Sequence, residues 1–598
     1  MTTLERPANP LLFLFGQTWR FAGEYRRTIV KFWALFIGSE LMELYLLPVI
    51  WAQIMTVLQR SGRVTPENLP ILLSLLSLTL GSTILIWALH GPGRVLECQT
   101  AFTVRANYRK HLLSGITALP MAWHVEHHSG DTIDKIEKGT TALYNFSEDS
   151  YEVIYAIISL LGSYIILSYF SPPAALTVIA MVFVTGSIIM NIDRVLVPQY
   201  GELNKTENGI AQSVLDTISN ISTVIILRVE RLVLAAISEK IDAPFALFSD
   251  NRRRNEFKWF LTSLCCSVMM VTVLGVYFWQ HLNASEGIII GEVYLLIKYL
   301  DNIRNLFFRF AWLYGDIVRR TSAVMNAEEL AKDFADPIIT DHVLPPDWQE
   351  LQISNLNFSY FERDTAQHLA DIAVTLKRGQ RIAFIGESGS GKTTLLKILR
   401  DLYQPHSLTL TADGVEIPSG FAGIEQAVSL IPQNPEIFAN SILENITHGA
   451  EHDMATIFRC TNIACFTDVV EQLPRSFDST TKEKGVNLSG GQQQRLALAR
   501  GFFASLDKDI ILLDEPTNNL DVPTEKQIYQ NIFREFEGKT IVSSIHRLHL
   551  LPLFDLIYLF EDGRIIASGS HEELLAQSGY FRELWREFQF VALSASPQ

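Results

Sequence analysis

The sequence is poor in cysteine and in charge. It contains 5 cysteines in 598 residues, too few for a disulfide framework and without a CxxC metal spacing, which favours a reducing compartment. Charged residues make up 19% of the chain, against about 25% in an average soluble protein. The net charge of −15 argues against a nucleic-acid partner. The length of 598 residues predicts several domains, and the low charge content points to membrane segments.

Long uncharged apolar runs occupy the first half of the chain. A helix of about 20 apolar residues crosses the core of a bilayer, and four runs of about this length contain no Asp, Glu, Lys or Arg. They are residues 69–89, 153–170, 172–192 and 260–279. Residues 28–56 and 287–310 are weaker candidates because they include charged side chains. We therefore predict six membrane-spanning helices in an integral, multi-pass protein.

Basic residues predict the orientation of these helices. The long connections 94–138 and 194–258 are rich in Lys and Arg, whereas the short connections near 170–173 and 281–286 have none. By the positive-inside rule, the long connections and both termini lie in the cytoplasm, which fits a bacterial inner (plasma) membrane. The first residues show no cleavable signal peptide. Aromatic residues interleaved with a basic one predict an interfacial elbow helix within residues 1–27.

The sequence changes character near residue 330. Residues 28–330 form the predicted transmembrane domain, whose long connections have helical periodicity and extend the membrane helices into the cytoplasm. Residues 331–349 carry prolines and charges and are a predicted linker. Residues 350–590 alternate β-rich runs with helical segments, which is typical of an α/β domain. Residues 591–598 form a C-terminal tail.

The strongest chemical motif is Gly386–Thr393 (GESGSGKT). It follows an apolar strand and precedes a helix-forming run, which is the context of a phosphate-binding loop. Backbone N–H groups of such a loop surround phosphates, Lys392 would reach the β and γ oxygens, and the Thr393 hydroxyl would ligate Mg²⁺. The alternative is a plain glycine-serine turn, which does not explain the strand, the lysine and the hydroxyl together.

A carboxylate pair follows a second apolar strand at residues 510–513. Asp514 would hold Mg²⁺ directly or through water, and Glu515 would polarise an attacking water for in-line displacement. Such a pair is weak evidence alone. Its position after a phosphate-binding loop in the same domain makes nucleotide hydrolysis the favoured interpretation.

The pentapeptide Leu488–Gln492 (LSGGQ) makes a family resemblance visible. Together with Tyr360, Gln433, Asp521 and His546, in this order around the phosphate loop, it resembles the motif set of an ABC transporter of the type IV exporter-like half-transporter class. The resemblance implies an α-helical six-span membrane domain with long cytoplasmic helix extensions, followed by an α/β P-loop ABC ATPase domain. It also implies ATP and Mg²⁺ as cofactors.

The resemblance carries roles to individual residues. The catalytic group would be Glu515, His546 and Gln433. The metal group would be Thr393, Gln433 and Asp514. The ATP-binding group would be Tyr360, Gly386, Glu387, Ser388, Gly389, Ser390, Gly391, Lys392, Thr393, Thr394, Ser489, Gly490, Gly491, Gln492 and Asp521.

The same resemblance implies a dimer. Tyr360 would stack on adenine, whereas Ser489 and Gly491 would offer a hydroxyl and a backbone N–H to the γ-phosphate of ATP bound on the opposite protomer. Intact motifs favour a homodimer over a heterodimer. Two segments depart from the family pattern: Asn518–Asp521 (NNLD) stands where Ser-Ala-Leu-Asp is usual, and Glu483–Gly485 (EKG) where Glu-Arg-Gly is usual. Both departures keep the acid that the motif needs.

Two cytoplasmic segments resemble coupling helices, which transmit closure of the ATP-binding domains to the membrane helices. They are Leu119–Asp131 and residues 215–230. His124, His127 and His128 have the i, i+3, i+4 spacing of a metal site on a helix. Their place inside the first coupling segment, with no cysteine nearby, favours a structural role instead.

Three features of the membrane segments invite local interpretations. Glu40 and Glu43 lie inside the first span, where ionisable groups are costly. They could attract a cationic substrate or take up protons. Their place shortly before the first-span proline favours a role in helix packing instead. Lys298 and Asp301 are predicted to pair. The Gly91–Gly93 segment (GPG) is predicted to break or kink the second span.

These observations predict an ATP-driven transporter that exports or flips an amphipathic substrate, such as a lipid, a peptide or a hydrophobic compound, by alternating access. The expected partners are a second copy of the chain, the lipid bilayer and the transported molecule. Import through an exporter-like fold and a membrane-anchored regulatory ATPase are the alternatives. No peptidase domain precedes the first span, so we do not expect cleavage of a leader peptide.

Overall fold

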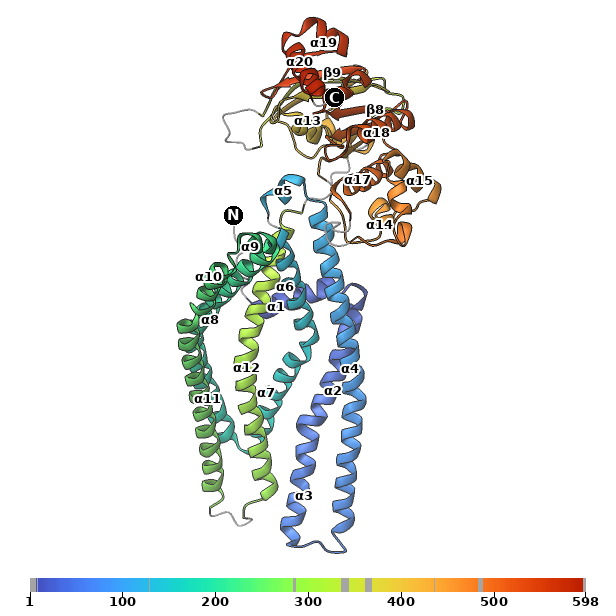
Figure 1. Cartoon of the computed structure of the whole chain (residues 1–598). Coiled ribbons are helices and arrows are strands. Elements are labelled where there is room, and N and C mark those ends of the chain that lie inside the picture. Colours follow the sequence, from blue (N-terminus) through green and yellow to red (C-terminus); the bar gives the residue numbers. More distant parts are fainter. Residues whose placement is uncertain are drawn as a thin grey trace. The chain divides into compact units, whose positions relative to one another are not determined.

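The computed structural model describes residues 7, 9–127, 129–282, 287–334, 344–360, 368–434, 436–481 and 488–594. The chain folds into two compact units (Figure 1). The first comprises Met1–Leu119 and His127–Ala335, and the second comprises Pro120–Glu126 and Asp336–Gln598. The second unit is therefore built from two separate stretches of sequence. The Glu483–Gly485 segment and His128 lie outside the described residues.

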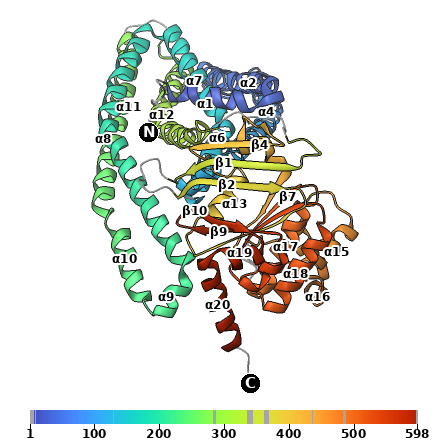
Figure 2. The same ribbon diagram turned by 90° about the horizontal axis from the view of Figure 1, so that it is seen from above.

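The first unit is helical, and several of its helices are longer than a bilayer requires. They are α1 (Pro10–Phe21), the short turn η1 (Gly23–Tyr25), α2 (Arg26–Leu41), the π-helical turn η2 (Met42–Leu46), α3 (Leu47–Ser61), α4 (Leu69–Thr117), α6 (Ser129–Glu148), α7 (Ser150–Phe170), α8 (Pro172–Ser219), α9 (Ile221–Leu227), α10 (Glu230–Asp242), α11 (Phe245–Gln280) and α12 (Ile290–Ala331). The 49 residues of α4 extend about 74 Å at the usual helical rise, whereas a hydrocarbon core is about 30 Å thick. Figures 1 and 2 show α8 and α11 running side by side. The prediction of long helices that continue past the membrane is confirmed.

Five helical stretches of the described chain are long and apolar enough to cross a membrane. They are Gly23–Ser61, Leu69–Thr117, Ser150–Tyr169, Pro172–Ser219 and Glu230–Gln280. The sixth predicted span falls in α12, which is long but more polar. This helix packs against α3, α6, α7 and α11, so neighbouring helices cover much of its surface. Its role as a sixth span stays a prediction.

Two local features differ from expectation. The helix α4 is continuous through Pro92, so a break does not occur there, whereas the alternative of a kink stays a prediction. There Gly93 permits close packing of α4 on α2, since a Cβ added to it would lie 3.0 Å from the ring of Phe36. Asp301 pairs with Arg304 one turn later, and the described residues show no pair between Asp301 and Lys298.

The second unit contains two sheets. A four-stranded antiparallel sheet has the order β2-β1-β4-β5, and a six-stranded sheet has the order β10-β9-β3-β8-β7-β6. The strands of the first are β1 (Glu350–Phe358), β2 (Leu369–Lys377), β4 (Ser407–Ala412) and β5 (Val415–Glu416). Those of the second are β3 (Arg381–Gly386), β6 (Val428–Ile431), β7 (Ile510–Asp514), β8 (Thr540–Ser544), β9 (Leu556–Glu561) and β10 (Arg564–Gly569). In the larger sheet all neighbours are parallel except β9 and β10.

The described part of residues 336–598 has eight α-helices. They are α13 (Lys392–Leu399), α14 (Ile442–Thr447), α15 (Met454–Ile463), α16 (Thr467–Glu471), α17 (Gly490–Ala504), α18 (Val522–Glu535), α19 (His571–Gln577) and α20 (Gly579–Ser594). Among them, α13, α17 and α19 contact strands of the larger sheet. All five residues of β7 are buried, which explains why this strand is an uninterrupted apolar run rather than an alternating one. Because β3, β6, β7, β8 and β9 run parallel, their carboxyl ends lie at one edge of the sheet, where ligands bind in such sheets.

The segment that resembles the first coupling helix is part of the second unit. It forms α5 (Met121–Glu126) and is grouped with Asp336–Gln598, although α4 and α6, which flank it in sequence, belong to the first unit. The second such segment forms α9, whose apolar side chains Ile225, Ile226 and Leu227 are exposed in the single chain. No group of three His, Cys, Asp or Glu residues in the described chain has the arrangement of a metal site.

Candidate functional site

The phosphate loop joins the carboxyl end of β3 to the start of α13, at an interior position of the larger sheet. Gly386 has φ 148°, and a Cβ added to it would lie 2.3 Å from the carbonyl oxygen of Phe560 on the neighbouring strand. Gly391 has φ 102° and a similar conflict with the Leu369 side chain. These positions need glycine because both the backbone conformation and the close neighbour exclude a side chain. The loop can then direct N–H groups at an anion.

Lys392 is folded into this loop and is almost fully buried. Its Nζ donates hydrogen bonds to the carbonyl oxygens of Gly386 at 2.9 Å and Glu387 at 2.8 Å, and contacts Ser390 Oγ at 3.3 Å. Burial lowers the pKa of Lys392, because desolvation disfavours the charged form. The ammonium group is therefore already held where the N-terminal end of α13 favours phosphate.

A hydroxyl and a carboxylate meet beside the loop. Thr393 Oγ1 and Ser544 Oγ both donate to Asp514 Oδ1, each at 2.8 Å. The register of β7 and β8 places Asp514 opposite Ser544. Burial raises the pKa of Asp514. An anionic oxygen and a hydroxyl oxygen in direct contact form the kind of hard-oxygen donor set that Mg²⁺ prefers, so the residues present fit that ion.

Three side chains hold the carboxylate of Glu515. Gln433 Nε2 and Asn518 Nδ2 both donate to Oε2 at 2.5 Å, and His546 Nε2 lies 2.7 Å from Oε1. The backbone N–H of Glu515 donates to Ser544 Oγ at 2.9 Å. With 7% of its surface exposed, this carboxylate is oriented and largely shielded from bulk water. Such a group can accept a proton from one positioned water.

Two of these partners, Asn518 and Ser544, were missed as functional residues by the sequence reasoning. Asn518 was visible only as a departure from the usual family pattern, and its contact with Glu515 explains what the longer amide side chain does there. Ser544 was visible as part of the segment before His546. Its link to both Asp514 and Glu515 depends on strand register, which the sequence does not reveal.

Tyr360 lies at the end of β1 on the side of the phosphate loop. Its hydroxyl is 3.1 Å from Thr394 Oγ1, and its ring meets His368 and Tyr403 edge-on. The side chain keeps 36% of its surface exposed, which leaves area for stacking on a base. Glu387 of the loop accepts a hydrogen bond from Tyr580 at 3.4 Å.

The signature segment is placed by the start of α17. Ser489 caps this helix by accepting from Gln492 N, and the Gln492 side chain accepts from Ser489 N in return. Gly490 has open space where a Cβ would be, and Gly491 lies against the Asn519 carbonyl. None of the hydrogen bonds among the described residues joins residues 489–492 to residues 386–394.

Asp521 and Arg547 fix the segment that follows the carboxylate pair. Asp521 caps α18 by accepting from Thr524 N at 3.1 Å, and this hydrogen bonding lowers the pKa of Asp521. Arg547, directly after His546, donates to the carbonyl oxygens of Asn518 and Leu520 and to buried Glu525. The sequence reasoning also missed Arg547, since only tertiary contacts reveal it.

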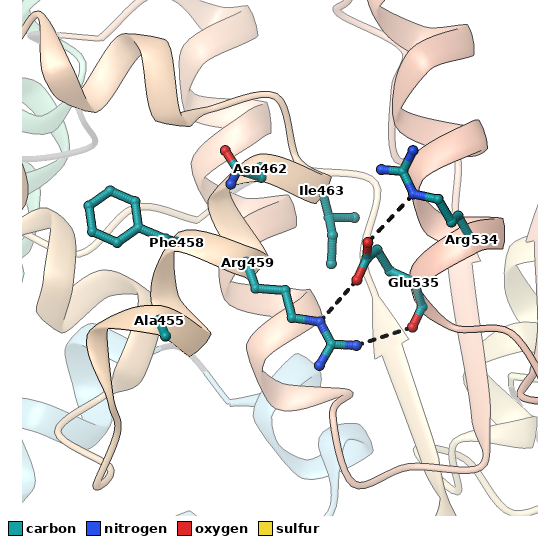
Figure 3. Close-up of a pocket in the computed structure, with 7 residues that line it drawn as sticks. All are labelled: Ala455, Phe458, Arg459, Asn462, Ile463, Arg534 and Glu535. Atoms are coloured by element: carbon teal, nitrogen blue, oxygen red, sulfur yellow. Dashed lines mark hydrogen bonds and ion pairs between the residues drawn. The ribbon is translucent and has the colours of Figure 1, made fainter.

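A separate surface cavity lies between α15 and α18 (Figure 3). It has a volume of about 480 Å³ and is lined by Phe458, Arg459, Arg534 and Glu535 among others. Arg459 contacts Glu535 at 3.0 Å and Arg534 contacts it at 3.5 Å. None of the nucleotide-site residues lines this cavity, so it is distinct from the phosphate loop.

Family models match both parts of the chain. The model described as ABC transporter transmembrane region matches residues 34–295, and the model described as ABC transporter matches residues 369–518. Together these matches cover most of the sequence. The second match contains the phosphate loop, the signature segment and the carboxylate pair.

Similar proteins and structures span most of the chain. A lactococcin transport/processing ATP-binding protein of Lactococcus lactis subsp. lactis is 26% identical over 508 residues, which is 82% of this chain and 67% of that protein. An ATP-dependent lipid A-core flippase of Pseudomonas aeruginosa is 26% identical over 513 residues, 84% of this chain and 83% of the flippase. The structure of a bacterial Atm1-family ABC exporter with ATP bound matches with a TM-score of 0.78 and 20% identity, over 96% of this chain and 99% of that one. That likeness supports the fold.

Proposed function

Because the chain is an ABC transporter in which a transmembrane region and an ATPase domain share one polypeptide, we propose that it exports or flips an amphipathic substrate as a homodimer. ATP binding closes the dimer and opens the substrate path between the membrane helices to the outside. Hydrolysis of ATP then returns the dimer to its starting state. We further propose a bacterial inner (plasma) membrane, with both termini in the cytoplasm. Basic connections between the spans support this orientation.

The observation that carries the homodimer is the incomplete site within one chain. Lys392 and Thr393 follow β3, and Asp514 and Glu515 lie at the end of β7, with β8 between the two strands. Ser489 instead caps its own helix and makes no hydrogen bond to the phosphate loop in the described chain. A second copy would supply its Ser489 and Gly491 to the γ-phosphate. Because the residues for both halves are intact in this sequence, two identical chains make two complete sites.

The proposed mechanism assigns each group a task. The phosphate loop and Lys392 bind the β- and γ-phosphates. Thr393 and Asp514 would hold Mg²⁺, which when bound neutralises charge on the phosphate oxygens. Glu515 accepts the proton of the attacking water, while Gln433 and His546 orient its carboxylate. His546 is 41% exposed at its side chain, so it can also face a nucleotide.

An amphipathic substrate fits the chain's membrane half and its relatives. The similar proteins are named for transport of lactococcin and for flipping of lipid A-core. Exposed apolar side chains on the long helices give the single chain a large surface for lipid and for a second copy. These observations therefore support an amphipathic class of substrate.

The first test replaces Glu515 with Gln in the full-length protein in liposomes. The amide keeps the shape of the side chain but cannot accept the water's proton, so ATP should bind without turnover and trap the closed dimer. Candidate lipids, peptides and hydrophobic cations should then move across the membrane with the parent protein and not with the variant. Hydrolysis by the variant at the parent rate would refute Glu515 as the base. Accumulation of substrate on the ATP side would refute export.

A second test concerns the composite site. A mixed dimer of one Lys392→Ala chain and one Ser489→Arg chain places both lesions in one site and leaves the other intact. A dimer with both changes on one chain damages both sites. The first pairing should retain more ATPase activity, provided that one-site turnover is shown independently. Equal activities would exclude the shared-site arrangement.

A further inference from the structure

Glu40 is a buried acid in the membrane half that lacks a partner. It lies near the end of α2, with 5% of its surface exposed. Its Oε2 is shielded from solvent and has no hydrogen-bond partner among the described residues. Neither a hydrogen bond nor an ion pair to the other carboxylate oxygen occurs within that part of the chain. An ionised carboxylate in such surroundings is strongly unfavourable unless something neutralises it.

Two other acids of the helical unit, buried Glu97 and half-buried Asp193, have partners. Glu97 of α4 accepts from Arg94 at 2.6 Å, from Ser150 Oγ at 2.6 Å and from Tyr151 N at 2.9 Å. Asp193 of α8 contacts Lys258 of α11 at 2.8 Å. The bundle thus supplies cationic or N–H partners where an acid serves packing. Glu40 differs because its neighbours supply none, which counts against the packing role expected from the sequence.

The charges around Glu40 sum to an excess of acid. Those that act on it electrostatically are Glu43 on the next helical turn, Glu152 of α7 and Arg309 of α12. Arg309 is already engaged, since it contacts Glu152 at 3.0 Å and lies over the Tyr155 ring at 4.2 Å. Three carboxylates therefore share one guanidinium group. A further positive charge would balance this part of the bundle.

The described part of α4 that packs on α2 near Glu40 brings no unpaired Lys or Arg. On α4 the titratable ring of His90 packs against Phe36, one turn before Glu40, at 5.4 Å between ring centres. Farther along α4, Arg94 is engaged by Glu97 and Glu148. Arg94 and Arg309 are thus already paired, and Lys298 of α12 is not among the charges that act on Glu40, which leaves Glu40 to an external positive charge.

The local backbone also departs from a regular helix. The π-helical turn η2 begins two residues after Glu40, and such turns are frequent at functional sites. Pro48 follows it and has no N–H to donate, which disturbs the regular helical hydrogen bonds. The Tyr45 hydroxyl in this turn donates to the Ile158 carbonyl oxygen, and its ring stacks with Tyr299 of α12 at 6.3 Å.

Additional buried polar atoms line the same helices. Tyr299 OH and Asn302 Nδ2 of α12 and Ser163 Oγ of α7 are buried without a hydrogen-bond partner among the described residues. A buried polar atom that stays unpaired costs about 1–3 kcal/mol. Several such atoms on α7 and α12, the helices whose Glu152 and Arg309 act on Glu40, are polar groups that a bound species can satisfy.

We propose that Glu40 binds a single positive charge inside each protomer, between α2, α7 and α12. Two sources share this chemistry, namely a proton and the cationic group of an amphiphile. Binding of a proton is independent of the proposed direction of transport. Binding of an organic cation rests on the proposed function. In either case a neutralised Glu40 favours the helix arrangement described here, and an ionised Glu40 favours an arrangement that opens it to water.

The test uses the full-length parent protein in liposomes with dicyclohexylcarbodiimide. This reagent adds to a protonated carboxyl group in an apolar environment, and the carboxyl proton moves to a reagent nitrogen without loss of a leaving group. Peptide mass mapping then reports the modified residues. Glu40 should be modified, and paired Glu97 should not. Equal modification of both, or none at Glu40 at any pH, would overturn the proposal.

Two arms distinguish the sources. With N-methylglucamine as the only added cation, modification should fall about tenfold per pH unit above the titration range if a proton is bound. At constant pH, tetraphenylphosphonium should protect Glu40 if an organic cation competes for the site. Either response supports the proposal. Modification that responds neither to pH nor to tetraphenylphosphonium would show a permanently neutral structural acid and would refute it.

Variants complete the experiment. In liposomes, Glu40→Gln should remove the dependence of basal ATPase activity on pH or on tetraphenylphosphonium while ATP binding is retained. Glu43→Gln is the matched control on the same helix, where the side chain is exposed in the single chain, and it should leave modification of Glu40 in place. Loss of that modification in Glu43→Gln would refute the assignment to Glu40. A response to both agents that persists in Glu40→Gln would refute it as well.

Discussion

Replacement of Asn518 by Ala should slow ATP hydrolysis about tenfold without weakening nucleotide binding. Asn518 donates to Glu515 Oε2 at 2.5 Å and does not contact the phosphate loop in the described chain. A hydrogen bond to a charged group contributes about 1.5–3 kcal/mol. Because Gln433 still holds the same oxygen and His546 holds the other, we take the lower end of that range, which corresponds to a factor of about ten in rate.

The assay compares kcat and KM for ATP in liposomes. The kcat should fall and the KM should stay, since the lost contact orients the base rather than the nucleotide. Asn519→Ala is the matched control, because the neighbouring amide contacts Gln494 at 3.4 Å and not Glu515. The double variant Asn518→Ala with Gln433→Ala should lose more than the product of the single losses, since both donors serve one oxygen.

Three results would refute this reasoning about Asn518. One is a parent-like kcat in Asn518→Ala. Another is an equal loss in Asn519→Ala, which would point to a general effect of the segment. The last is a purely multiplicative double variant, which would mean that Gln433 and Asn518 do not act on the same carboxylate oxygen.

Further predictions follow from single contacts. Gly386→Ala should abolish ATP binding, measured by nucleotide titration, because the added Cβ would lie 2.3 Å from the Phe560 carbonyl oxygen. Gly389→Ala should bind ATP more tightly than Gly386→Ala, because a Cβ at Gly389 meets no atom within 4 Å. Arg547→Ala should lower the thermal midpoint of the ATPase domain by about 4–8 °C, because about 2 kcal/mol is lost beside buried Glu525. Adding Glu525→Gln should restore part of the lost midpoint, and no restoration would contradict the pairing. Burial raises the pKa of Asp514, so its favourable contribution is present below the ordinary aspartate pKa of about 3.9 and is lost as pH rises through the folded-state pKa. The nucleotide-free midpoint should therefore show a fall over this range that Asp514→Asn lacks, and identical profiles would refute that interpretation.

Much of the fold could be predicted because its signals are local. Uncharged runs of bilayer length indicate membrane helices, and a glycine-rich loop between a strand and a helix indicates a nucleotide-binding domain. The π-helical turn at Met42–Leu46 and the continuous helix through Pro92 could not be predicted, since they depend on how α2 packs against α4 and α7. The pairing of Asp301 with Arg304 instead of Lys298 has the same origin, because several partners stand at helical spacing.

The candidate site divides in a similar way. Lys392, Thr393, Asp514 and Glu515 follow from short motifs, and the structure brings Thr393 to Asp514 across more than one hundred residues. The roles of Ser544 and Arg547 follow from strand register and from side-chain contacts, which no motif encodes. The partnerless state of Glu40 is likewise a tertiary property, because the sequence shows the acid but not the absence of a cation among its described neighbours.

The position of β3 in its sheet has a consequence for how the protein is made. Both neighbours of this strand, β8 and β9, lie C-terminal to it, and β8 begins about 150 residues later. At about 5–20 residues per second, the ribosome needs roughly 8–30 s to deliver the first partner. During that interval β3 has no adjacent strand to pair with. Exposed apolar strands of this kind are prone to aggregate and are bound by chaperones. Newly made chains should therefore depend on chaperones until β8 has left the ribosome, and truncated chains that end before Thr540 should be degraded rather than accumulate as ATP-binding fragments.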